Sequence, residues 1–136
     1  MLDPMAAPLT DERLPTLKAT RVGLRWLKAE DAEAIYAIFA DREVTRYWSS
    51  PAMTRLEQAE DLIQSVHRHF AEGDLYQWGI ADLGDDRVIG TVTLARLDWS
   101  NRRTEIGFSL HRQSWGQGLA REATTLAVRF AFDTLD

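Results

Sequence analysis

Arg112-Gln113-Ser114-Trp115-Gly116-Gln117-Gly118 lies near the end of the chain and contains two closely spaced glycines. It separates a strand-like run at Thr104–Leu110 from a helix-like run at Leu119–Leu135. Two glycines one residue apart at such a junction allow a sharp turn and a close approach to the backbone N–H groups. The following helix directs its unpaired N–H groups and positive dipole end into the loop. The stretch therefore predicts an anion-binding loop, above all for phosphate, and a tight turn without a ligand is the alternative.

The charge distribution favours the anion-binding interpretation. The 136 residues carry a net charge of −5, which argues against a general nucleic-acid-binding protein. Segment 87–129 nevertheless holds seven arginines against three acidic residues, a net of +4, and contains the glycine loop. Arginine suits phosphate because its guanidinium group can make two parallel hydrogen bonds. An anionic ligand is therefore expected in this part of the chain.

Length and composition indicate one globular domain, with 45% hydrophobic residues. No apolar run approaches the roughly 20 residues of a membrane-spanning helix, and residues 1–15 lack the pattern of a secretory signal. The absence of cysteine excludes disulfides and fits a cytoplasmic location. Three of the four prolines lie in residues 1–15, so we predict a flexible N-terminal lead-in over 1–19 and the domain over 20–136.

Hydrophobic periodicity predicts an α+β fold with the element order β-α-α-β-β-β-α. We expect strands at Thr20–Leu27, Tyr76–Asp82, Val88–Leu97 and Thr104–Leu110, and helices at Glu30–Phe39, at Leu56 to about Gly73 and at Leu119–Leu135. Thr54 and Glu57 match a capping box at the start of the second helix. The loop lacks the Gly-Lys-Ser/Thr of a P-loop and the distant acidic residue of a Rossmann fingerprint.

Several motifs, in the right order, resemble the GNAT superfamily of N-acetyltransferases. Gln113–Gly118 matches the signature Gln/Arg-x-x-Gly-x-Gly/Ala of that family. Its Rim-type branch acetylates protein N-termini and related amines, and similar motifs occur here at Leu24–Leu27, Asp31-Ala32, Val44–Tyr47, Ile89–Val92, Glu105–Phe108 and Trp115–Ala123. The resemblance covers Thr20 to Asp136.

The resemblance implies an acetyl-CoA-dependent N-acetyltransferase with a three-layer fold, in which a mixed, mostly antiparallel sheet has helices on both faces. The pyrophosphate would lie on the backbone amides that precede and begin the last helix, and the pantetheine arm would pair with the strand before the loop. The implied cofactor-binding residues are Phe108, Ser109, Leu110, Arg112, Gln113, Ser114, Trp115, Gly116, Gln117, Gly118, Leu119 and Ala120. Arg121 is a further candidate, with a solvated helix face as its alternative.

Direct transfer to an amine makes Glu105 and Ser109 candidate catalytic residues. The amine must be neutral, which at pH 7 costs about 4.6 kcal/mol for a lysine side chain and about 1 kcal/mol for an α-amine. A general base is therefore needed for lysine and useful for an N-terminus. Some relatives place a carboxylate base at the position of Glu105, whose alternative role is a surface acid facing Arg102 or Arg103. Ser109 could hydrogen-bond the substrate or be an ordinary strand residue.

Trp48 and Tyr76 are the candidate acceptor-binding residues. Tyr47 and Trp48 lie between the first two helices, where members of the family close over the substrate. Core packing is the alternative for both candidates, and it is the expectation for Trp78. His67 and His69 face different sides of their helix, so no metal site is predicted.

The family continues beyond its third helix with a fifth strand, a fourth helix and usually two more strands. The chain is therefore expected to be C-terminally incomplete, with its general acid unassigned, or to be completed by another chain. The exposed strand edge at Thr104–Leu110 allows a possible homodimer. The alternative function is a non-catalytic CoA-binding or interaction module. Neither nucleic acid nor a membrane is expected as a partner.

Overall fold

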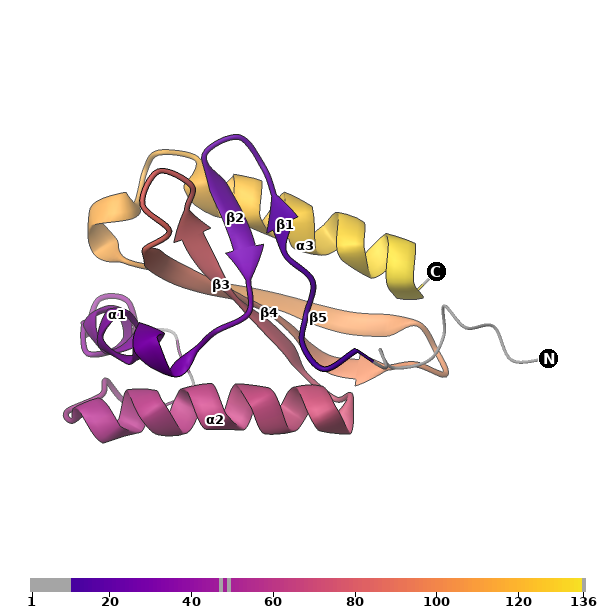
Figure 1. The fold of residues 1–136 in the computed structure, drawn as a ribbon, viewed down its shortest axis with the longest axis horizontal. Helices are drawn as coiled ribbons and strands as arrows, with labels where there is room; N and C mark the ends of the chain where they lie inside the picture. Colours follow the sequence, from indigo (N-terminus) through magenta and orange to yellow (C-terminus); the bar gives the residue numbers. More distant parts are fainter. Residues whose placement is uncertain (1–10, 47, 49, 136) are drawn as a thin grey trace.

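The computed structural model describes residues 11–46, 48 and 50–135. Its five-stranded sheet has the order β1-β2-β3-β4-β5, with α1 and α2 on one face and α3 on the other (Figure 1). The elements are β1 (Leu17–Lys18), β2 (Val22–Arg25), α1 (Ala32–Phe39), α2 (Leu56–Glu72), β3 (Tyr76–Asp82), β4 (Val88–Asp98), β5 (Arg103–Leu110) and α3 (Leu119–Leu135). The predicted α+β architecture is confirmed, and every described strand pair is antiparallel.

Two apolar cores stabilise the layers, one on each face of the sheet. Val92 and Leu94 of β4 pack in one core with Ala123 and Ala127 of α3. The other core lies between the sheet and the first two helices, and contains Ile35, Ile38, Ile63 and Val66. Both faces of the central strands are therefore covered, which holds the end of β5 and the loop after it in place.

The N-terminal boundary differs from the prediction. Leu14 is buried, and the Trp78 indole N–H donates to the Pro15 carbonyl at 3.0 Å. Leu17 and Lys18 then form β1, which pairs with β2. The flexible lead-in predicted over 1–19 is thus corrected for residues 14–18, because an apolar side chain and a paired strand fix them to the domain.

Both ends of α2 have identifiable caps. The Gln58 side chain accepts hydrogen bonds from the N–H groups of Thr54 and Arg55, at 2.6 and 3.0 Å. The side chain that completes the capping box is therefore that of Gln58 and not that of Glu57, as predicted from the sequence. Gly73 ends the helix with a φ of 74°, a conformation that glycine adopts without steric cost.

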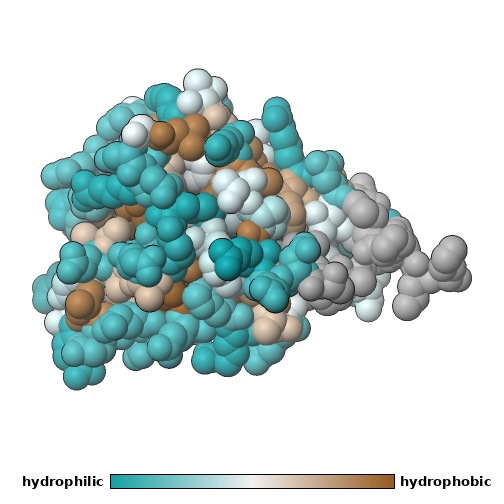
Figure 2. Space-filling view, in the orientation of Figure 1, coloured by the Kyte–Doolittle hydropathy of each residue, from teal (hydrophilic) through white to brown (hydrophobic). Residues whose placement is uncertain are grey.

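The surface is dominated by hydrophilic residues on the side shown in Figure 2, where apolar residues form separate small patches. Within the described residues, no helix has the length and apolar character needed to cross a bilayer.

An ion pair joins β2 to the start of α1. Arg25 donates to both carboxylate oxygens of Asp31, at 2.8 and 2.9 Å, and Asp31 also accepts from the Lys28 N–H at 2.8 Å. Burial raises the pKa of Asp31, but the hydrogen bonds from Arg25 and Lys28 outweigh it, so the pKa lies below its usual value. The unfolded chain therefore binds more protons in acid, and the contribution of Asp31 to stability is lost as the pH falls below about 4.

We expect Asp31→Asn to destabilise the fold by about 2 kcal/mol at pH 7, because charge-assisted hydrogen bonds to a buried carboxylate are lost. The difference from the unaltered chain should shrink as the pH is lowered toward 3. Urea unfolding at several pH values measures both effects, with Glu33→Gln on the exposed side of α1 as the matched control. An equal loss at every pH would contradict the assignment to the charged pair.

Candidate functional site

The loop between β5 and α3 has the backbone geometry expected of an anion-binding loop. A 3-10 turn at Arg112–Ser114 begins it, and His111 Nδ1 accepts a hydrogen bond from the Gln113 N–H at 3.2 Å. Gly116 and Gly118 then adopt φ values of 75° and 78°. These left-handed conformations explain the two glycines, because other residues reach them only at a cost in energy.

Two side chains brace the loop from within. The Trp115 indole N–H donates to the Leu110 carbonyl at 2.8 Å, which ties the loop back to the end of β5. The Gln117 side-chain amide donates to the Gln113 carbonyl at 3.1 Å. Trp115 therefore anchors the loop.

The backbone N–H groups at the start of α3 are available to a ligand. The first intrahelical hydrogen bond runs from the Glu122 N–H to the Gly118 carbonyl at 3.2 Å. From Gly116 to Arg121, no backbone N–H donates to any described residue. Six consecutive donors at a helix N-terminus, where the dipole is positive, suit a group that carries several anionic oxygens.

A cavity of about 400 Å³ opens beside these donors. Most of the predicted cofactor residues line it, from the end of β5, the loop and the first turn of α3. They are Phe108, Ser109, Leu110, Ser114, Trp115, Gly116, Gly118, Leu119 and Ala120, and Val44 adds a wall from the α1–α2 segment. We call this cavity the donor pocket.

Arg112 does not line the donor pocket. Its guanidinium makes a bidentate ion pair with the carboxylate of Asp41, at 2.7 and 2.9 Å. The sequence predicts that Arg112 binds the cofactor. In the structure its guanidinium is instead bound to Asp41, so a phosphate would have to replace that carboxylate.

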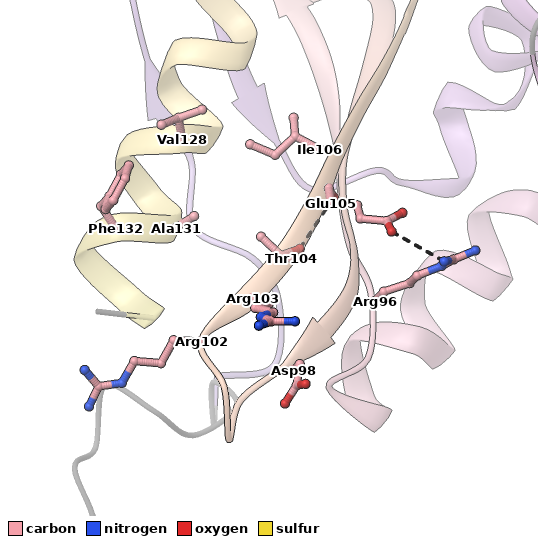
Figure 3. A pocket seen from close by; sticks show the side chains of 10 residues that line it. All are labelled: Arg96, Asp98, Arg102, Arg103, Thr104, Glu105, Ile106, Val128, Ala131 and Phe132. Carbon is pink, nitrogen blue, oxygen red and sulfur yellow. Dashed lines mark hydrogen bonds and ion pairs between the residues drawn. The ribbon is translucent and has the colours of Figure 1, made fainter.

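A second cavity, of about 600 Å³, lies between β5 and α3 (Figure 3). Ile106 points toward Val128 and Phe132 of α3, and the charged side chains lie at the rim. Ile106 and Phe132 are both exposed. This groove is largely apolar, and it follows the outer edge of β5.

Glu105 lies on the opposite side of β5 from α3 and points toward Arg96, with 3.4 Å between the charged atoms (Figure 3). For a surface acid at this position the sequence suggests Arg102 or Arg103 as the partner, and the observed partner is Arg96. The Glu105 side chain is 65% exposed, so this is a surface ion pair. Ser109 follows four residues later on the same strand, roughly 13 Å along it. The two candidate catalytic residues therefore do not touch, and only Ser109 lines the donor pocket.

The two candidate acceptor residues have different surroundings. Tyr76 is 1% exposed, and its ring packs against those of Phe70, Trp99 and Phe130. The structure thus gives Tyr76 the core role, because a substrate could reach it only by displacing core side chains. Trp78 is buried in the core as expected.

Trp48 remains accessible. Its ring lies 4.6 Å from that of Phe39, and it lines a shallow cavity of about 500 Å³ beside α2. No lining residue is common to this cavity and the donor pocket. Tyr47, named with it in the sequence analysis, lies outside the described residues.

The histidines have structural partners. His67 stacks on Trp26 with 4.5 Å between ring centroids and hydrogen-bonds the Leu27 carbonyl. His69, Glu72 and Asp74 place ligand-type atoms within 4.8 Å of one another on the surface, and His69 Nδ1 already hydrogen-bonds Asp74 at 2.9 Å. The absence of a catalytic metal stays a prediction.

Sequence reasoning missed two residues of the site, Asp41 and Val44. Val44 belongs to a motif that resembles the family, and no sequence motif includes Asp41. Both lie in a short segment after α1, and no local pattern indicates that this segment lies against a loop 71 residues further on. Any acidic residue of the chain could have been the partner of Arg112, and the sequence gives no reason to prefer Asp41.

Residues 21–136 match the family model described as acetyltransferase (GNAT) domain. The uncharacterized N-acetyltransferase YoaA of Bacillus subtilis (strain 168) is 36% identical over 121 residues, which is 89% of this chain and 68% of YoaA. The uncharacterized N-acetyltransferase p20 of Bacillus licheniformis is 35% identical over 123 residues, 90% of this chain and 69% of p20.

Solved structures share the fold at lower identity. The RimL ribosomal alpha-N-protein acetyltransferase, in complex with coenzyme A, superposes with a TM-score of 0.69 at 15% identity, over 85% of this chain and 67% of that one. The matches and the glycine loop agree, and the chain belongs to the GNAT family of acetyltransferases.

Proposed function

We propose that this chain transfers the acetyl group of acetyl-CoA to a primary amine, either a protein or peptide N-terminus or a small amine. The donor pocket is the observation that carries the proposal. It joins Gly116, Gly118 and the first turn of α3, whose backbone N–H groups have no partner among the described residues, to the end of β5. One part of the pocket can therefore hold phosphate and another a thioester arm.

The pyrophosphate of acetyl-CoA fits the loop chemically. Charge-assisted hydrogen bonds are worth about 1.5–3 kcal/mol each, whereas the helix dipole adds only about 0.3–1 kcal/mol. Several loop amides together therefore account for more of the affinity than the dipole. The left-handed glycines at positions 116 and 118 set the directions of these amides.

The pantetheine arm fits the outer edge of β5. Phe108, Ser109 and Leu110 line the donor pocket at the end of this strand, and β5 is the last strand of the described sheet. Its outward backbone groups can pair with the amides of an extended arm, as a neighbouring strand would. The acetyl carbonyl would then lie near Ser109, where a backbone N–H could stabilise the oxyanion of direct attack.

An α-amine suits this site better than a lysine side chain. The candidate base Glu105 is exposed and ion-paired, and roughly 13 Å of strand separates it from Ser109. An acceptor that costs only about 1 kcal/mol to neutralise depends less on a base. RimL is a ribosomal alpha-N-protein acetyltransferase, and its similarity in fold supports the same acceptor class.

Acetyl transfer to a mixed pool of amines tests the proposal. The pool should contain peptides with different N-terminal residues, peptides with a blocked N-terminus and an internal lysine, and small amines. Mass spectrometry of the products identifies the acceptor, and calorimetry with acetyl-CoA measures donor binding. We expect binding and transfer to at least one α-amine or small amine.

A non-catalytic CoA-binding module is the second candidate, because Glu105 is paired with Arg96 and lies outside the donor pocket. Binding of acetyl-CoA without acetylation of any amine in the pool would favour it. The mass of the assembled protein should be measured in the same samples, because the outer edge of β5 could also support a homodimer.

For Glu105→Gln we expect acetylation of a lysine-type amine to slow by only about threefold at pH 7, since Glu105 is exposed, paired with Arg96 and roughly 13 Å along β5 from Ser109, too far to act as an efficient general base. Acetylation of an α-amine should slow less, and both rates should recover as the pH rises and neutral amine becomes abundant. Initial rates between pH 6.5 and 9.5 measure this. Glu60→Gln, on the exposed side of α2, is the matched control. Unchanged rates at pH 7 would remove Glu105 from the mechanism.

A further inference from the structure

We propose that the ion pair between Arg112 and Asp41 is a positioning device, which holds the wall of the donor pocket and links the donor loop to the segment before α2. The inference rests on the proposed function. It assigns Arg112 a role other than the phosphate contact that its place in the sequence suggests.

The pair has the geometry of a specific clamp. Arg112 Nε donates to Asp41 Oδ2 at 2.9 Å, and Nη2 donates to Oδ1 at 2.7 Å. The Asp41 side chain is only 17% exposed, against 56% for Arg112. These hydrogen bonds hold the pKa of the Asp41 carboxyl below its usual value, so the pair is charged at neutral pH. Bidentate arginine–carboxylate pairs fix orientation as well as distance.

Asp41 also organises the segment that follows α1. Its Oδ1 accepts a hydrogen bond from the Glu43 N–H at 2.9 Å, and its carbonyl accepts from the Thr45 N–H at 3.1 Å. The Trp48 N–H in turn donates to the Thr45 carbonyl at 2.9 Å. A continuous set of hydrogen bonds therefore runs from Arg112 through Asp41 and Thr45 to Trp48.

Val44 is the part of this segment that reaches the donor pocket. Every other residue that lines the pocket lies between Phe108 and Ala120. The pocket is thus closed on one side by a segment distant in sequence, and the clamp fixes that segment to the first residue of the 3-10 turn. Loss of the clamp should let Val44 move away from the pantetheine arm, and a small displacement of this kind lowers both affinity and rate.

The positioning role and the phosphate role predict opposite effects for one substitution. If Arg112 acts through Asp41, removing the charge of Asp41 weakens acetyl-CoA binding as much as removing that of Arg112. If Arg112 instead binds the pyrophosphate, Asp41→Asn releases it for that contact, and affinity stays equal or rises.

The test compares Asp41→Asn, Arg112→Gln, the double variant and the reversed pair Asp41→Arg/Arg112→Asp. We expect each single variant to weaken acetyl-CoA binding by about tenfold, and the double variant to be no weaker than the singles, because they remove one interaction. The reversed pair should recover part of the affinity, because it restores the ion pair but not the hydrogen bond from the Glu43 N–H to residue 41. Calorimetry measures binding, and Glu43→Gln, which removes a neighbouring charge in the same segment, should leave it unchanged.

Acetyl-pantetheine provides a second readout, because it carries no phosphate. The single variants should raise its KM by a similar factor if the clamp positions the pocket wall. Thermal unfolding of each variant shows whether the fold is retained, and the reversed pair distinguishes a lost clamp from a general loss of structure.

Three outcomes would overturn the inference. Tighter or equal acetyl-CoA binding by Asp41→Asn together with weaker binding by Arg112→Gln would assign Arg112 to phosphate. If Asp41→Asn and Arg112→Gln both bound acetyl-CoA with unchanged affinity, the ion pair would have no role in the donor pocket. If the unaltered chain itself bound no acetyl-CoA, the proposed function would fail and the inference with it, a result distinct from the first two.

Discussion

Gly118→Val is expected to abolish acetyl-CoA binding while the fold largely persists. Gly118 has a φ of 78°, in a region that a β-branched residue avoids. A Cβ at this position would also lie 3.3 Å from Arg21 Nη2, closer than most natural contacts. The loop would therefore return to a negative φ, and this rotates the neighbouring N–H groups away from the ligand.

The expected loss of affinity is large because several donors share one loop. If two charge-assisted hydrogen bonds of about 1.5–3 kcal/mol are lost, affinity falls by more than a hundredfold. Gly116→Val should act in the same way, since Gly116 has a φ of 75°. No atom lies within 4 Å of a Cβ built on Gly116, so its effect tests backbone conformation without crowding.

Gly107→Val is the matched control for both glycines. It lies in β5 with ordinary extended backbone, and no atom is within 4 Å of its added Cβ. Calorimetry with acetyl-CoA should show near-normal affinity for this control, while thermal unfolding shows that all three variants fold. Unchanged affinity of the Gly118 and Gly116 variants would remove the loop from the binding site.

Much of the fold could be predicted because its signals are local. The bounds of β3 and α3 equal the predicted ones, since turn residues and glycines flank clear hydrophobic patterns there. The glycine loop was found for the same reason: a strand, two glycines and a helix follow one another directly in the sequence. Such features depend on residues close together in the chain.

The remaining differences depend on tertiary contacts. Tyr76 and Trp48 are both aromatic residues near polar segments, and only packing shows that Tyr76 is buried while Trp48 lines a cavity. Arg112 pairs with Asp41 across 71 residues. The two-residue strand β1 exists because β2 offers it a partner. None of these contacts leaves a periodic signal in the sequence.

Gly90→Val is expected to have the largest effect on stability. Gly90 lies in β4 opposite Leu110 of β5. A Cβ at this position would come within 2.3 Å of the Ser109 carbonyl oxygen and 3.1 Å of the Leu110 Cα, which are backbone atoms that no side-chain rotation can move. The two strands must separate at the point where β5 enters the donor loop.

The energetic cost should exceed that of ordinary overpacking, which is about 1–3 kcal/mol, because here the clash is with backbone. We expect a loss of about 3 kcal/mol or more, and a fall in Tm of roughly 10 °C. Gly90→Ala should show a smaller loss of the same sign. Gly107→Val again serves as the control, because it places the same side chain in the partner strand without a clash.

The position of the clash also predicts a functional consequence. The His111 N–H donates to the Ile89 carbonyl at 2.7 Å, so the residue next to Gly90 holds the start of the loop. Separation of β4 from β5 would displace Ser109, Leu110 and this contact together. Gly90→Ala should therefore lose acetyl-CoA affinity even at temperatures where thermal unfolding shows it to be folded. If Gly90→Ala kept the acetyl-CoA affinity of the unaltered chain but lost stability, the prediction would be wrong. The donor pocket would then tolerate a shift of β5.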